Sequence, residues 1–108
     1  MVKVKVWRDE NKKVTAFRCE GHAGYISEND EFDMVCAAVS GIVYSALGYM
    51  EEYYGIDDFN ENDGFIEWKR QNKIKESIVS NISPVLDAMV VGLKQIELQY
   101  GKNIKVVD

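Results

Sequence analysis

The chain has 108 residues, with 13 basic and 18 acidic side chains and a net charge of −5. This length suits one domain, and 46% apolar with 29% charged residues is ordinary for a folded globular protein. The acidic balance argues against direct nucleic-acid binding, for which clustered Lys and Arg supply most of the affinity. We find no signal peptide and no apolar run of transmembrane length, so we expect a cytoplasmic protein with no membrane partner and with reduced thiols.

Two strands are predicted at the beginning of the chain. Val2, Val4 and Val6 alternate with polar or large residues over 2–7, and residues 14–20 form a second strand after a polar turn. In the second strand, Thr15, Phe17 and Cys19 are expected to share one face. A polar, acidic loop then runs to about Phe32.

A long helix is predicted from about residue 33 to a cap at Gly55. Its expected core face comprises Val35, Val39, Ile42, Ala46, Tyr49 and Tyr53. The Asp63-Gly64 step predicts a hairpin between strands 56–59 and 65–70.

A second helix follows and ends at Gly101, before a last strand at 104–107. Pro84 either kinks this helix or sits in its first turn behind Ser83. Its expected buried stripe comprises Ile78, Ile82, Val85, Met89, Leu93, Ile96 and Tyr100. The order ββαββαβ predicts a single α+β domain with two long helices packed on a mixed sheet.

Cys36 and the only histidine, His22, are candidates for nucleophilic catalysis by a thiol with an imidazole partner. If Asp33 is the helix N-cap, Cys36 lies at the third helical position, where the helix end and an imidazolium neighbour would lower its pKa. His22 follows Gly21 at the end of the second strand and could reach the sulfur as base and then as acid. The free amides at the helix start, including that of Cys36, could donate hydrogen bonds to the oxyanion of a tetrahedral intermediate.

Other interpretations of these residues stay open. Cys36 could be a buried packing residue, and a Cys19–Cys36 disulfide fits the sequence less well than two free thiols. One His and two Cys without C-x-x-C spacing predict no metal site, and nothing indicates a cofactor. Asp33 could orient His22 instead of capping the helix. Ala37 and Ser40 could line a substrate pocket or serve close helix packing.

The segment Gly21-His22-Ala23-Gly24-Tyr25, followed by Asp33-x-Val35-Cys36-Ala37-Ala38-Val39-Ser40, closely resembles the signature of the ribosomal-processing cysteine proteases (Prp). The resemblance extends over almost the whole chain. It implies that His22 and Cys36 form a catalytic dyad. It also implies a homodimer that removes the N-terminal extension of a large-subunit bacterial ribosomal protein.

Several expectations accompany this resemblance. Cys19 matches no position of the family pattern and is expected to pack inside its strand. The loop 23–32 is either a lid that closes over peptide or an ordinary surface loop. The tyrosines at 44, 49, 53 and 54 are expected in the core or at a dimer contact. The alternative function is a non-enzymatic ribosome-associated binding module, in which Cys36 is buried and unreactive.

Overall fold

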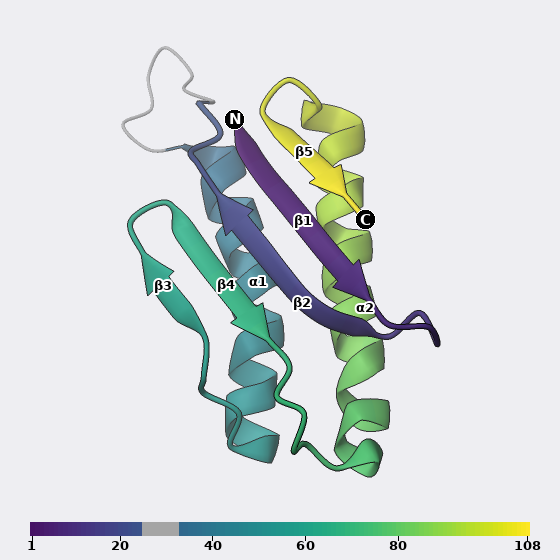
Figure 1. Ribbon diagram of the computed structural model, residues 1–108. Coiled ribbons are helices and arrows are strands. Elements are labelled where there is room, and N and C mark those ends of the chain that lie inside the picture. The colour runs from purple at the N-terminus through teal and green to yellow at the C-terminus, as the bar shows by residue number, and fades with distance from the viewer. Residues whose placement is uncertain (25–32) are drawn as a thin grey trace.

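The computed structural model describes residues 1–24 and 33–108, and it confirms the α+β fold with the ββαββαβ order. The strands are β1 (Val2–Arg8), β2 (Val14–Glu20), β3 (Asn60–Asn62), β4 (Phe65–Lys69) and β5 (Ile104–Val107). They form one sheet in the order β3-β4-β2-β1-β5. Only the β1–β5 pair is parallel, so the sheet is mixed. The helices α1 (Met34–Tyr54) and α2 (Glu76–Tyr100) lie on the same face of the sheet (Figure 1).

The core lies between the sheet and the two helices. Val2, Val4 and Val6 of β1 are buried, as their alternation predicts. In β2 the predicted face is partly wrong, because Val14 is buried with Phe17 and Cys19 whereas Thr15 is only half-buried. The cause is a register shift beside Trp7, which changes which residues at the beginning of β2 face inward.

Helix α1 begins after its N-cap, Asp33, and ends at Gly55 in the left-handed conformation at φ 65°. The sequence predicted both ends of α1 correctly, but it predicted the buried face of the helix only in part. Tyr53 is 65% exposed and Tyr49 is also exposed, because Val43, Leu47 and Met50 turn toward the sheet instead.

Helix α2 begins at Glu76, so Pro84 lies well inside it and the first-turn interpretation was wrong. Its buried face also differs from the predicted stripe. Ile82, Met89 and Leu93 are buried as expected, whereas Ile78, Val85, Ile96 and Tyr100 are half-buried. The remaining inward positions are Val79, Ser83, Leu86 and Val90.

The second hairpin differs from the prediction in its first strand. Residues 56–59 form no strand, and β3 consists of Asn60–Asn62, which were expected in the turn. The apolar Ile56 and Phe59 instead pack against the core from an irregular segment. Because β3 is an edge strand whose three side chains are all exposed, its sequence carries no apolar alternation.

Both helices are long and apolar enough to cross a membrane by length and composition alone. The expectation that no apolar run reaches this length was therefore wrong. Each helix has 33% of its most apolar window buried inside the domain, and core helices of compact domains pass the same test. Two such helices are weak support for a membrane span.

Candidate active site

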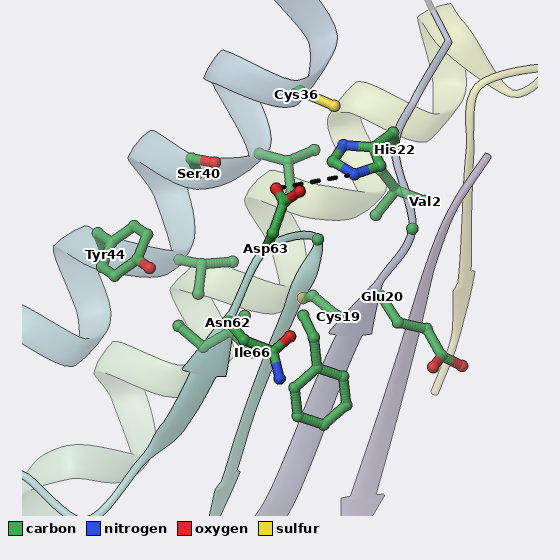
Figure 2. Close-up of a pocket in the computed structure, with 15 residues that line it drawn as sticks. Val2, Cys19, Glu20, His22, Cys36, Ser40, Tyr44, Asn62, Asp63 and Ile66 are labelled. Atoms are coloured by element: carbon green, nitrogen blue, oxygen red, sulfur yellow. Dashed lines mark ion pairs between the residues drawn. The ribbon is translucent and has the colours of Figure 1, made fainter.

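Three segments that are distant in sequence meet at one end of the sheet (Figure 2). These are the residues that follow β2, the first turns of α1 and the β3–β4 turn. The antiparallel pairing of β2 with β4 brings Glu20 opposite Phe65, and the Gly21 amide donates to the Gly64 carbonyl at 2.8 Å. The β3–β4 turn is thereby fixed beside the segment that carries His22.

Cys36 is the third residue of α1, and a capping interaction fixes its backbone. The Asp33 carboxylate accepts a hydrogen bond from the Cys36 amide at 3.0 Å. The Ala23 amide donates to Cys36 Sγ at 3.1 Å, so the thiol is tied to the residue that follows His22. The predicted capping role of Asp33 is confirmed. The suggestion that the Cys36 amide is free to donate to an oxyanion was wrong for this state, because that amide already donates to Asp33.

His22 follows a glycine whose conformation no other residue adopts easily. Gly21 has φ 97°, and a Cβ added there would lie 2.4 Å from the Met1 carbonyl oxygen. The imidazole lies against the β3–β4 turn, with Nε2 3.9 Å from Asp63 Oδ1. A Cβ added at Gly64 would lie 2.8 Å from the same Nε2, so the turn closes one side of the ring.

The segment carrying His22 is also held from the far end of the chain. Asn103, which precedes β5, donates from Nδ2 to the Ala23 carbonyl at 2.9 Å. Its own carbonyl accepts from the Val2 amide at 2.9 Å. Ala23 is therefore fixed through both of its backbone polar groups, one to Cys36 and one to Asn103.

His22 and Cys36 line one cavity of about 220 Å³. Figure 2 shows the thiol and the imidazole on neighbouring segments at its upper end, with Ser40 and Tyr44 following Cys36 along the same side of α1. Its lining also includes the buried apolar residues Val39 and Ile66. This arrangement places a thiol, an imidazole and space for a side chain in one cavity.

The environment of Cys36 does not lower its pKa, contrary to the prediction. Burial of the half-buried thiol raises its pKa above the ordinary value. The Ala23 hydrogen bond to Sγ opposes this shift, whereas the negative charge of Asp33 adds to it. The N-cap that orders the helix start is thus a carboxylate that disfavours the thiolate.

Comparison with known proteins assigns the chain to a family. The model of the family described as "Cysteine protease Prp" matches residues 1–105. The chain belongs to this family.

Three further comparisons agree with that assignment. The ribosomal processing cysteine protease Prp of Bacillus subtilis is 24% identical over 98% of this chain and 96% of its own length. The Staphylococcus aureus Prp crystal structure with a covalently linked product peptide has a TM-score of 0.81 at 24% identity, covering 98% of this chain and 97% of that chain. The same S. aureus protease with a substrate peptide gives 0.79 at 22% identity, covering 99% and 98%. At these identities the structural likeness supports the fold, and the family model carries the assignment.

Most of the residues selected from the Prp-like signature come together in the structure. Gly21, His22, Cys36 and Ser40 all line the cavity. Ala37 is exposed and does not belong to the lining, so its predicted place beside the substrate is not supported by this cavity.

The signature contains no residue of β3 or of the β3–β4 turn, although Asn62 of β3 and the turn residues Asp63 and Gly64 line the cavity. The Asp63-Gly64 step identifies a hairpin turn in the sequence, but nothing in the sequence places that turn beside His22. Tyr44 was expected in the core or at a dimer contact. It lines the cavity and donates to the Glu61 carboxylate of β3.

Cys19 behaves as the expected packing residue. It is buried, both cysteines are free thiols, and burial raises the pKa of Cys19 to about 12. The predicted lid, 23–32, lies largely outside the described residues, which stop at Gly24 and resume at Asp33.

Proposed function

We propose that the protein is a cysteine endopeptidase that removes the N-terminal extension of a large-subunit ribosomal protein. Cys36 is the nucleophile and His22 is the proton carrier. The observation that carries the proposal is the shared cavity, in which the Ala23 amide binds Cys36 Sγ and the adjacent residue is His22. Membership in the cysteine protease Prp family supports the reaction class. The name of the B. subtilis relative supports the ribosomal substrate.

In the proposed reaction, Cys36 Sγ attacks the carbonyl carbon of the scissile bond and its proton passes to His22. The imidazolium then donates this proton to the leaving amine, which leaves an acyl-enzyme. Water, deprotonated by His22, hydrolyses the thioester and releases the second product. The free thiol is restored at the end of the cycle.

The raised pKa of Cys36 determines when the proton moves. A thiol with a pKa above its ordinary value is almost entirely protonated at neutral pH. We therefore propose that His22 removes the proton as the peptide is attacked, because burial and Asp33 disfavour a resting thiolate. A substrate carbonyl that took over the Ala23 hydrogen bond would remove a contact that favours the thiolate, so proton transfer to His22 would still be needed.

The test is cleavage of the unprocessed ribosomal protein, followed by mass spectrometry of the products. Wild type is expected to release the N-terminal segment, whereas Cys36→Ala and His22→Ala are expected to release none. Cys19→Ala is the comparison variant: it removes the other thiol, which is buried and lines the same cavity but does not receive the Ala23 hydrogen bond, so cleavage should persist. Undiminished cleavage by Cys36→Ala rejects the mechanism.

The alternative, a ribosome-associated binding module, predicts a different result. The protein would then bind the unprocessed ribosomal protein and leave it intact. Homodimerisation and a cytoplasmic location remain proposals, which sedimentation of the purified protein and fractionation of cells can check.

A further inference from the structure

The sheet has one face against the helices and one face without them. Figure 1 shows α1 and α2 together behind the sheet, and in the described part of the chain no other element covers the opposite face. The side chains on this open face follow from the register, because paired residues point to the same side. Lys3, Lys5 and Trp7 of β1 point away from the core, since Val2, Val4 and Val6 point into it.

The charge of this open face is opposite to that of the whole chain. The register places five basic and two acidic side chains on it: Lys3, Lys5, Arg18, Lys69 and Lys105 against Glu20 and Glu67. The face therefore carries +3 in a protein of net charge −5. The negative net charge of the chain led to the prediction of no nucleic-acid binding, but the local distribution of charge decides where a polyanion can bind.

Three lysines form the centre of the positive charge. Lys3 lies beside Lys105 of the parallel strand β5, and Lys5 follows on the same side of β1. They line a hollow together with Arg18 and Glu20, and Glu20 of β2 is the register partner of Lys3. Within residues 1–24 and 33–108, no carboxylate lies within ion-pair distance of these three ammonium groups. Adjacent like charges on a sheet are unfavourable, and a bound anion would relieve their repulsion.

An aromatic ring lies next to these charges. Trp7 is half-buried on the open face, with Lys5 Nζ 5.1 Å and Arg18 Cζ 5.8 Å from its ring centroid. Phe65 of β4, opposite Glu20, is a second half-buried aromatic residue on the same face. Aromatic and basic side chains that alternate on an open sheet can stack bases and neutralise phosphates.

We propose that the open face of the sheet binds single-stranded RNA. Lys3, Lys5 and Lys105 would contact phosphates, and Trp7 would stack on a base. An acidic peptide would use the lysines but would gain little from a stacking surface. A duplex would hide its bases from Trp7. The observations therefore favour an unpaired RNA strand.

The experiment measures binding of a fluorescein-labelled 12-nucleotide RNA of mixed sequence by fluorescence anisotropy over a range of salt concentrations. The test variant is the triple substitution Lys3→Glu, Lys5→Glu and Lys105→Glu. The matched control is Lys73→Glu, Lys75→Glu and Lys102→Glu, three exposed lysines outside the strands of the sheet. Both variants have the same net charge, so their difference reports only the position of the lysines. Circular dichroism confirms that both are folded.

We expect the test variant to bind RNA at least tenfold more weakly than the control. The slope of log K against log salt should fall in magnitude by about 2 relative to wild type, because each phosphate contact on a single strand contributes roughly 0.7. Trp7→Ala should weaken RNA binding with little change in that slope, whereas Trp7→Phe should retain most of the wild-type affinity. The readout is independent of cleavage, so it does not depend on the proposed proteolysis.

Three outcomes would overturn the proposal. Wild type could show no salt-dependent RNA binding, or the two triple variants could lose affinity equally. A poly-glutamate peptide or an RNA duplex could also bind as tightly as the single strand, which would reduce the face to a general site for anions.

Discussion

Gly64→Ala tests whether the β3–β4 turn holds His22 in its working position. The added Cβ would lie 2.8 Å from Nε2 of His22, whereas ordinary contacts of this kind begin near 3.4 Å. The imidazole or the turn must therefore shift, by about 0.6 Å if the contact is to become an ordinary one. Displacements approaching 1 Å cost up to about 100-fold in rate where proton transfer depends on position. We expect kcat/KM for the unprocessed ribosomal protein to fall by roughly 10- to 100-fold.

The substitution also strains the backbone, and this effect needs a separate control. Gly64 has φ 70°, so alanine there should lower the free energy of unfolding by about 1 kcal/mol. Gly55→Ala creates nearly the same strain at φ 65°, but its added Cβ has no atom within 4 Å and it lies at the far end of α1. Urea unfolding should therefore report similar losses for both variants, while only Gly64→Ala loses activity. If Gly64→Ala retained activity within twofold, or if Gly55→Ala lost as much, the turn would not position the imidazole.

The pH midpoint for Cys36 alkylation by iodoacetamide should lie above the ordinary thiol pKa. Asp33→Asn should lower this midpoint, because it removes a nearby negative charge while keeping a capping side chain. An unchanged midpoint in Asp33→Asn would contradict the effect assigned to Asp33. The pKa of Cys19 is about 12 in the folded protein, so the folded state holds this proton more tightly than the unfolded chain. Stability from this group is present below the ordinary thiol pKa and is lost as pH rises toward 12, so urea unfolding should show a steeper loss above pH 9 in wild type than in Cys19→Ala. Asp63→Asn should change kcat/KM by less than about threefold, because the carboxylate is 98% exposed and 3.9 Å from His22; a loss near that of Gly64→Ala would assign the role of the turn to this charge.

The local features of the fold were predictable from the sequence. Helix α1 is bounded by Asp33 and Gly55, a side-chain cap and a left-handed glycine, and both have local causes. Strand β3 was misplaced because an exposed edge strand carries no apolar pattern. The exposed side of α1 was misjudged at Tyr49 and Tyr53, since an aromatic residue at helical spacing fits a core or a surface equally well.

The candidate site was predictable only where its residues lie close together in the sequence. His22 and Cys36 belong to one short segment, and the resemblance of that segment to a known signature selected them. The contribution of Gly64 depends on the pairing of β2 with β4, which joins residues more than forty positions apart. The direction of the Cys36 pKa shift depends on how deeply the thiol is buried, which the sequence does not specify.

The hydrogen bond from Asn103 to the Ala23 carbonyl joins residues 80 positions apart. A growing polypeptide on the ribosome lacks this support until Asn103 has been synthesised and has emerged from the exit tunnel. The segment that carries His22 and binds Cys36 Sγ is therefore fully held only after Asn103 has joined the fold. The contact between Ala23 and Cys36 joins residues 13 positions apart, but the backbone that makes it is anchored on both sides only by a partner from the other end of the fold.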